Sequence, residues 1–288
     1  MTPCSLPYTA DDVSLPASLP TVHEIESATE VFGDTTGRKV VGIGPHFVVK
    51  YGVQVEPLEG RTMLFLAQST QIPIPRVYAI FQNATQKFTY IVMERIDGKS
   101  LDLEWPRMDF ATKDAVASQL RSVFNELRKL ASPGGYCSVD HQGLPDGIFW
   151  TSDPSKPFAG PFDSEEELNE AIVLKYTKSG LSKHKAKYYA RTFASVFRNH
   201  KPTFSHGDFQ RKNVLIRDRA ARSSGAHPEL VIIDWEFAGW YPSYWEYSRA
   251  IFACARWEDD WNDWVDKILE PFRNEYAWQE ILLGELWS

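Results

Sequence analysis

Residues 205–216, "SHGDFQRKNVLI", place polar and charged side chains directly before a short apolar run. The run "NVLI" predicts a strand, and a second apolar run, "LVIID", predicts another that ends at Asp234. A polar loop separates the two runs, so we expect them to form a hairpin. Asn213 and Asp234 would then lie at one edge of the same small sheet.

The rest of the chain changes character near residues 94–98. Before that point, β-branched residues around the Gly-Pro turn of "GRKVVGIGPHFVVKYG" predict a hairpin, and apolar residues at helical spacing predict a helix over 56–70. Beyond it, the periodicity predicts mainly helices, most clearly over 112–132. We therefore expect an α+β protein with a small β-rich N-terminal lobe (1–96) and a larger, mainly helical C-terminal lobe (97–288).

Composition limits the classes of protein to which the chain can belong. Its formal net charge is −7, whereas a nucleic-acid binder usually carries a basic face. The chain has no apolar stretch of the roughly 20 residues that a membrane helix needs, and its N-terminus lacks the apolar core of a signal peptide. Three widely spaced cysteines do not predict a disulfide framework. We expect a cytoplasmic protein without a membrane or nucleic-acid partner.

The spacing of His206, Asp208 and Asn213 matches a known catalytic pattern. Protein kinases use His-x-Asp-x4-Asn in their catalytic loop. There the Asp accepts or orients the proton of the acceptor hydroxyl, and the Asn oxygen reaches a Mg²⁺ ion on the phosphates. Asp234, at the end of an apolar strand, suits a second Mg²⁺ ligand. Taken singly, each residue has a plainer interpretation as a solvated loop charge or a turn cap.

Lys50 ends the second strand of the predicted N-terminal hairpin, and Glu59 follows on the predicted helix. In a phosphoryl-transfer site, a lysine here would contact the nucleotide phosphates and the glutamate would hold it in place. The alternative is an exposed Lys–Glu pair, which contributes little to stability. Gly42 and Gly44 would let the hairpin backbone approach a nucleotide, although the sequence has neither a Gly-x-Gly-x-x-Gly nor a Walker A loop there.

Together these segments resemble the aminoglycoside phosphotransferase (APH) family of the wider choline-kinase-like and protein-kinase-like group, and especially its fungal-type members. The matching segments are "FVVKYG", "EGRTMLFLAQSTQIPIPRVYAIF", "YIVMERIDGKSL", "GPFDSEEELNEAI", "FSHGDFQRKNVLI" and "IIDWEFAGWYPSYWEY". The resemblance implies a bilobal protein-kinase-like fold and a small-molecule kinase that uses ATP and Mg²⁺ to phosphorylate a hydroxyl group. One departure is Glu59-Gly-Arg-Thr-Met, where the family often has Glu-Ala-Glu-Ala-Leu.

The resemblance also implies a role for each matching residue. Asp208 would be the catalytic base, or the carboxylate that orients the acceptor hydroxyl. Asn213 and Asp234 would hold Mg²⁺. Lys50 would contact the α- and β-phosphates of the nucleotide, steadied by Glu59. Adenine would meet the backbone of a hinge that consists of Met93, Glu94, Arg95 and Ile96.

Other polar residues near these motifs have two interpretations each. His206 is expected to bond within its own loop rather than to act as a ligand. Arg211 and Lys212 would either neutralise the transferred phosphate or be plain loop charges, and Glu236 would either support the metal ligands or cap a turn. The acidic tail "ARWEDDWNDWVDKILE" favours an amphipathic helix with its tryptophans in the core over a surface for a cationic substrate.

The acceptor stays open, because related folds phosphorylate antibiotics, choline, sugars and amino-acid-like alcohols. The oligomeric state stays open as well. An alternative function is an inactive nucleotide- or ligand-binding protein of the same fold, but the intact set of Lys50, Asp208, Asn213 and Asp234 argues against it. A protein kinase is disfavoured, because Ile-Asp-Trp-Glu stands in place of Asp-Phe-Gly and no Ala-Pro-Glu segment follows.

Overall fold

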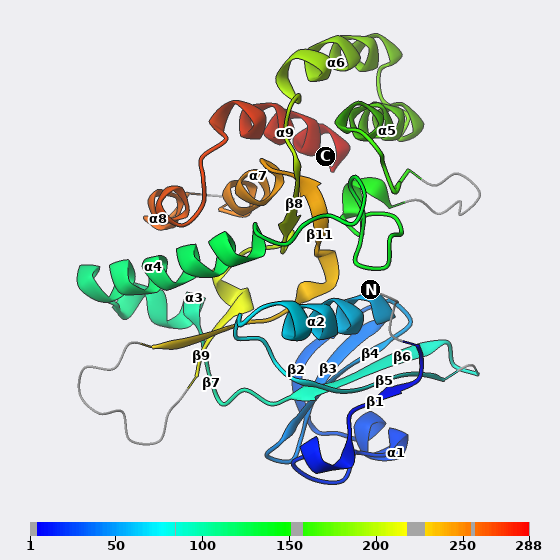
Figure 1. Ribbon diagram of the computed structural model, residues 1–288, viewed down its shortest axis with the longest axis vertical. Helices are drawn as coiled ribbons and strands as arrows, with labels where there is room; N and C mark the ends of the chain where they lie inside the picture. The colour runs from blue at the N-terminus through cyan, green and yellow to red at the C-terminus, as the bar shows by residue number, and fades with distance from the viewer. Residues whose placement is uncertain (1–4, 84, 151–157, 218–227, 255–256, 288) are drawn as a thin grey trace. The chain divides into compact units, whose positions relative to one another are not determined.

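The structure is a computed structural model that describes residues 5–83, 85–150, 158–217, 228–254 and 257–287 (Figure 1). Every residue with a predicted site role lies within these ranges. The chain divides into two compact units. Unit 1 combines Met1–Ser100 with Val214–Glu236, and unit 2 combines Leu101–Asn213 with Phe237–Ser288.

Unit 1 is built on a six-stranded antiparallel sheet with the strand order β1-β5-β6-β4-β3-β2. Its strands are β1 (Tyr8–Thr9), β2 (Glu30–Thr35), β3 (Arg38–Ile43), β4 (Phe47–Gly52), β5 (Val77–Asn83) and β6 (Phe88–Glu94). The predicted hairpin is β3–β4. Helix α1 (Val22–Glu26) is short, and the chain that follows it pairs with β3 as strand β2.

Side chains of β4 alternate between the two faces of this sheet, which fixes the direction of Lys50. Val49 and Tyr51 pack with Ile25 of α1 in a buried apolar core. Lys50 lies between them in sequence and therefore faces the other way. Its cross-strand neighbours are Val40 and Ile91, and helix α2 (Pro57–Ser69) packs against the neighbouring strands β5 and β6.

Gly60 explains why a glycine interrupts the apolar pattern of α2. A Cβ atom at this position would lie 2.6 Å from Cδ1 of Ile80 on β5. Such a contact would force Ile80 or the helix to shift, so glycine lets α2 approach the sheet closely. Because Glu59 is the preceding residue, the same close approach brings its carboxylate to the sheet face that carries Lys50.

The second sheet of unit 1 has three strands in the order β10-β9-β7. The strands are β7 (Gly98–Ser100), β9 (Val214–Arg217) and β10 (Glu229–Ile232). The sequence predicts the β9–β10 hairpin as part of the C-terminal lobe, but the hairpin groups with unit 1, since β7 is its third strand. The functional division into 1–96 and 97–288 stays a prediction.

Unit 2 is mainly helical. Its helices are α3 (Leu101–Glu104), α4 (Phe110–Leu127), α5 (Glu165–Lys178), α6 (Lys183–Val196), α7 (Trp245–Phe252), α8 (Trp261–Ile268) and α9 (Arg273–Leu286). Helix α5 packs on α6, α4 on α8 and α7 on α9. A two-stranded sheet joins β8 (Pro202–Ser205) to β11 (Gly239–Pro242). The β-rich sheet and the helical part confirm the predicted α+β class.

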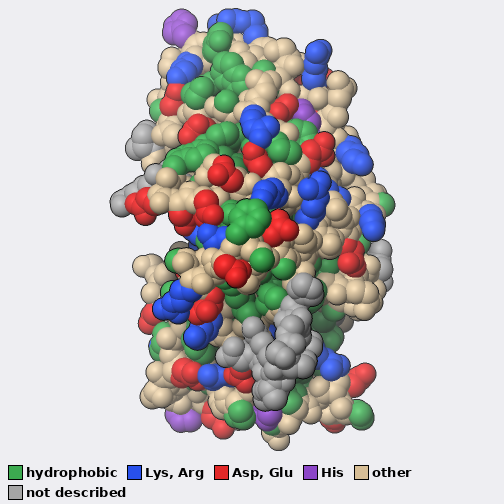
Figure 2. Space-filling view, turned by 90° about the vertical axis from the view of Figure 1, so that its left-hand side faces the viewer, with side chains coloured by type: hydrophobic (Ala, Val, Ile, Leu, Met, Phe, Trp, Pro, Cys, Tyr) green, Lys and Arg blue, Asp and Glu red, His purple; other side chains and the backbone are tan. Residues whose placement is uncertain are grey.

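The remaining regular segments are short 3-10 turns at Asp12–Ser14, Trp105–Arg107, Gly147–Phe149, Arg211–Asn213 and Trp235–Phe237. Within the described ranges, every helix is too short or too polar to cross a bilayer. On the face drawn in Figure 2, acidic and basic side chains are interspersed rather than sorted by sign. The cytoplasmic location and the exclusion of a nucleic-acid partner stay predictions.

His200 joins α5 to α9 in unit 2. Its Nδ1 lies 2.7 Å from Glu165 Oε1 and its Nε2 lies 3.4 Å from Glu275 Oε1. Burial lowers the pKa of His200, but the two carboxylates raise it by more, so the net pKa lies above its ordinary value. A raised folded-state pKa means that protonated His200 stabilises the fold fully below about pH 6.5, and that this stabilisation is lost as the pH rises through the raised pKa.

We expect His200→Gln to lower the melting temperature by about 2–6 °C near pH 6, since charged hydrogen bonds to both carboxylates are lost. The difference from the wild type should shrink as the pH rises, because the wild type then loses the same charge. Thermal unfolding followed by circular dichroism between pH 5.5 and 9 measures this. His184→Gln, at an exposed position of α6, is the control. A His200→Gln deficit that does not change with pH would contradict the assignment.

Candidate functional site

A buried lysine surrounded by carboxylates forms the centre of unit 1. Lys50 Nζ lies 2.7 Å from Glu59 Oε2, 2.6 Å from Asp234 Oδ1 and 3.0 Å from Glu236 Oε2. The side chains of Lys50 and Glu59 are only 6% and 3% exposed. Lys50 and Glu59 therefore do not form the exposed surface pair of the alternative interpretation. Because both are buried, their mutual attraction is stronger than that of a surface pair.

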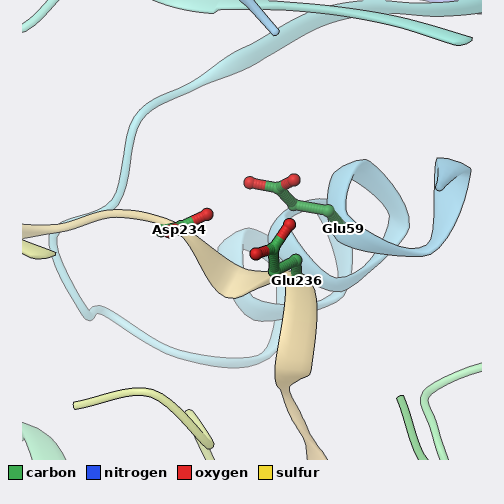
Figure 3. Close-up of side chains that lie close together, drawn as sticks. All are labelled: Glu59, Asp234 and Glu236. Atoms are coloured by element: carbon green, nitrogen blue, oxygen red, sulfur yellow. The ribbon is translucent and has the colours of Figure 1, made fainter. Parts of the chain in front are cut away.

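Glu59 comes from α2, whereas Asp234 and Glu236 follow the end of β10. Figure 3 shows the three carboxylates pointing toward one another. Asp234 has a φ of 67°, in the left-handed region that non-glycine residues adopt at a cost of roughly 1 kcal/mol. Such strained backbone is common at functional sites, where the surrounding structure holds the residue in place.

The charges of this cluster do not balance around Lys50. Burial lowers the pKa of Lys50, but Glu59, Asp234 and Glu236 together raise it by more, so the ammonium form is favoured. Burial raises the pKa of Glu59 to about 7, against the opposing attraction of Lys50 and with repulsion from the other two carboxylates. Even with Glu59 protonated, the Lys50 ammonium alone does not compensate both Asp234 and Glu236. The cluster has capacity for further positive charge.

Three carboxylates of this cluster are placed so that they could hold a divalent cation. One oxygen from each of Glu59, Asp234 and Glu236 lies within 4.8 Å of the others. Carboxylate oxygens are the ligands that Mg²⁺ prefers, and Mg²⁺ is bound through one or two of them. Among the described residues, these three are the group of acidic, cysteine or histidine side chains placed for a metal ion.

Arg38 is a second cation of the cluster that the sequence reading missed. Its Nη1 donates to both carboxylate oxygens of Glu236, each at 2.5 Å. Arg38 and Val40 point to the same sheet face, and Val40 pairs with Lys50 across the strands. This alternation was the available sequence signal. Glu236 thus has a defined partner on β3.

The segment 93–96 spans the end of β6, and two of its N–H groups already donate hydrogen bonds. Glu94 N–H donates to Arg76 O at 2.8 Å, and Arg95 N–H donates to His46 O at 2.9 Å. The Arg95 guanidinium donates to the carboxylate of Glu30 at 2.5 and 2.7 Å. These bonds fix the path of the segment.

Gly42 has a different role from the one expected. A Cβ atom there would collide with the Glu30 carboxylate and with Arg95 Nη1. The glycine therefore makes room for the Glu30–Arg95 ion pair. The turn of a different hairpin, β2–β3, contains Gly37, which has a φ of 85° and directly precedes Arg38.

In unit 2, Asp208 lies in the loop between β8 and the turn Arg211–Asn213. Asn213 Nδ2 donates to the backbone O of Asp208 at 2.9 Å and to its Oδ2 at 3.0 Å. Gln210 Nε2 also donates to Oδ1 of Asp208. The Asp208 side chain is 21% exposed, and the Lys212 ammonium lies 3.8 Å from it. The loop therefore holds the carboxylate in one orientation and leaves it accessible.

Glu246 on α7 holds the backbone of this loop through its buried carboxylate. The buried Glu246 carboxylate accepts the N–H of His206, and that of Gly207 at 3.4 Å. Burial raises the pKa of Glu246, against the opposing effect of His206. His206 itself is fully buried, and its Nδ1 accepts from Asp208 N–H at 3.2 Å, as expected for a loop-bonding residue.

The sequence predicts no role for Glu246, although Glu246 lies in "IIDWEFAGWYPSYWEY", one of the segments that carry the family resemblance. The available signal was a lone carboxylate inside the aromatic run "YWEY", since a buried charge requires partners. Its partners are backbone N–H groups of a loop 40 residues earlier, which no local pattern indicates.

A cavity of about 230 Å³ lies beside this loop. Its lining includes Gln210, Arg211 and Lys212 from the loop, together with Asp102 and Asp259. Arg211 Nη2 pairs with Asp259 Oδ2 at 2.6 Å, and its guanidinium lies over the Trp261 ring. Arg211 is thus tied to the start of α8, whereas the Lys212 side chain is 56% exposed.

The acidic tail is mainly structural. Trp261, Trp264 and Val265 are buried, as the amphipathic-helix interpretation predicts. Asp260 accepts from Lys113 Nζ and from the indole N–H of Trp264, both at 2.9 Å. Trp257 differs from the expectation, since it is 50% exposed and lines the cavity.

The structure therefore brings the predicted site residues together in two groups. Unit 1 holds Lys50, Glu59, Asp234 and the segment 93–96. Unit 2 holds Asp208 and Asn213. Within each group the side chains contact one another directly, apart from those of the segment 93–96.

We expect Lys50→Met to lower the free energy of unfolding by about 3–5 kcal/mol, because it leaves buried carboxylates without their ammonium. Adding Glu59→Gln should restore part of this loss, since one uncompensated charge is then removed. Urea unfolding of the single and double variants measures both effects. Lys39→Met is the control, because Lys39 lies on β3 with its side chain on the opposite sheet face from Lys50 and makes only a loose 3.8 Å pair with Asp34. A Lys50→Met protein as stable as the wild type would refute this view.

Comparison with known proteins identifies the family. The sequence model of the family described as "Phosphotransferase enzyme family" (APH) matches residues 32–280. No curated protein sequence matches the chain. Among solved structures, the apo form of a thermostable mutant of aminoglycoside phosphotransferase APH(4)-Ia is 15% identical, with a TM-score of 0.57. The match covers 92% of this chain and 86% of that chain.

Two further structures give similar values. The GDP complex of an aminoglycoside 2'-phosphotransferase IIIa mutant is 14% identical, with a TM-score of 0.54 and coverage of 89% of this chain and 79% of that chain. The streptomycin–ATP–APH(2")-IIa ternary complex is 12% identical, with a TM-score of 0.53 and coverage of 92% and 82%. At these identities the structures show the fold, and they confirm the predicted protein-kinase-like fold.

Proposed function

Since the chain belongs to the phosphotransferase enzyme family, we propose that it is a small-molecule kinase that uses ATP and Mg²⁺ to phosphorylate a hydroxyl group. The observation that carries the proposal is the buried Lys50 ammonium among three carboxylates. A stable protein has no structural need for such an unbalanced cluster, whereas a nucleotide–metal site requires it. The ATP and GDP complexes among the structures of similar fold support a nucleotide ligand.

In this proposal Lys50 contacts the α- and β-phosphates and Glu59 keeps it in place. Asp234 and Asn213 hold Mg²⁺, which neutralises charge on the phosphates when bound. Asn213 uses its amide nitrogen to hold Asp208, so its amide oxygen is the atom proposed for the metal.

The segment formed by Met93, Glu94, Arg95 and Ile96 receives the base. The N–H groups of Glu94 and Arg95 already donate within unit 1. We therefore assign the base contacts to the Glu94 carbonyl and the Ile96 N–H. These two groups suit a base edge that carries one donor and one acceptor.

Asp208 is the residue proposed for the chemical step. The acceptor hydroxyl oxygen forms a bond to the γ-phosphorus, and the bond from that phosphorus to the bridging oxygen breaks, so that ADP leaves with the electron pair. The hydroxyl proton passes to the Asp208 carboxylate. Gln210 and Asn213 hold that carboxylate by hydrogen bonds, which supplies the orientation that catalysis requires.

The acceptor is proposed to be a small hydroxylated molecule that enters the cavity beside the Asp208 loop. The cavity volume of about 230 Å³ is below the usual range of about 300–1,000 Å³ for drug-sized ligands. Its lining has both acidic and basic side chains, so it does not select a polycation by charge alone. The streptomycin ligand of one structure of similar fold is a property of that protein.

We expect Asp208→Asn to lower kcat by about 10²–10⁴-fold, because the variant cannot accept the hydroxyl proton, while ATP affinity stays within about twofold. A coupled assay of ADP release, run with a panel of hydroxylated metabolites and aminoglycosides, measures turnover. Calorimetry measures ATP binding. Asp114→Asn, at an exposed position of α4, is the matched control.

The same panel discriminates the alternative of an inactive binding protein. ATP binding without acceptor-dependent ADP release for the wild type would favour that alternative. Turnover retained in Asp208→Asn would exclude the proposed role of Asp208.

A further inference from the structure

Arg38 lies beside the Lys50 cluster at a position that a bound ligand can reach. It is the first residue of β3, directly after the Thr36–Gly37 turn. By strand alternation, its side chain shares the sheet face of Lys50. Its side chain is 34% exposed, compared with 6% for Lys50. Arg38 is therefore the more accessible of the two cations.

Both cations contact the same carboxylate oxygen. Arg38 Nη1 lies 2.5 Å from Glu236 Oε2, and Lys50 Nζ lies 3.0 Å from the same atom. Arg38 thus reaches the part of the cluster to which Lys50 points. A ligand that contacts Lys50 through an anionic oxygen comes within reach of Arg38 as well.

The guanidinium suits a phosphate as well as a carboxylate. Its planar set of N–H donors binds both groups with the same geometry, so Glu236 holds Arg38 as a phosphate would. An ion pair between partly exposed side chains contributes little to stability, so exchanging the Arg38 partner costs little. The remaining carboxylates attract the metal that accompanies the phosphates.

We propose that Arg38 is a phosphate ligand of the nucleotide, which leaves Glu236 and binds the terminal phosphates when nucleotide enters. This inference rests on the proposed function, since it requires nucleotide binding at Lys50. The motifs of the chain assign Arg38 no role. The Arg38–Glu236 pair is then the nucleotide-free arrangement, in which Arg38 offsets the excess negative charge of the cluster.

The competing explanation is that Arg38 only holds Glu236 in position. The two explanations differ in what the phosphates contribute. A phosphate ligand affects ATP more than AMP, and it still affects ATP when Glu236 carries no charge. A positioning residue affects all nucleotides alike, and it has no effect beyond that of Glu236 itself.

The test measures the affinity of ATP, ADP and AMP in the presence of Mg²⁺ by calorimetry. The variants are Arg38→Gln, Arg38→Lys, Glu236→Gln and the double variant Arg38→Gln/Glu236→Gln. Lys39→Gln is the matched control, since Lys39 is the next residue on β3 and faces the opposite side of the sheet. Melting temperatures verify that each variant is folded, and Arg38→Lys preserves the charge if Arg38→Gln fails to fold.

We expect Arg38→Gln to weaken ATP binding by about tenfold or more, to weaken AMP binding by less than about twofold, and to act equally in the Glu236→Gln background. Arg38→Lys should lie between the wild type and Arg38→Gln. Equal losses for ATP and AMP, or no further loss in the Glu236→Gln background, would overturn the inference. A wild type that does not bind ATP would instead overturn the proposed function.

Discussion

The attraction between the Lys50 ammonium and three carboxylates is the interaction on which the site in unit 1 depends. It requires Lys50 on the face of the sheet opposite the apolar core, which the alternation of β4 provides. It requires α2 close to the sheet, which Gly60 permits. It also requires β10 to end just before Asp234 and Glu236. Strand β4 and helix α2 contribute one charged side chain each, the segment after β10 contributes two, and Arg38 of β3 adds a second cation.

The Asp208 loop of unit 2 is held by a separate set of contacts. Glu246 binds the backbone before Asp208, and Asn213 binds the carboxylate and the backbone of Asp208. Buried polar groups of this kind are costly unless they are fully paired, which restricts the loop to one conformation. In the proposed function the two units therefore have different roles. Unit 1 would supply charge for a nucleotide, and unit 2 would supply an oriented acceptor for a proton.

Several elements of the fold and several site residues could be predicted from the sequence, because local residue patterns determine them. β-Branched residues and helical periodicity indicated β3–β4, α2 and α4, and the spacing of Asp208 and Asn213 indicated their loop. Arg38, Glu246 and the pairing of β7 with β9 were missed, because each depends on contacts between segments far apart in the chain. Gly60 shows the same limit. In the sequence, a glycine inside a helix predicts reduced helix stability. The position of Ile80 on β5 explains why a glycine is needed there.

The most direct test of the central claim is the effect of Mg²⁺ on ATP affinity in the wild type and in Asp234→Asn, measured by calorimetry with Mg²⁺ or with EDTA. If the carboxylates of unit 1 form a metal–nucleotide site, Mg²⁺ strengthens ATP binding to the wild type by about tenfold or more and has little effect on Asp234→Asn. An equal Mg²⁺ effect in both proteins, or none in the wild type, would contradict the claim.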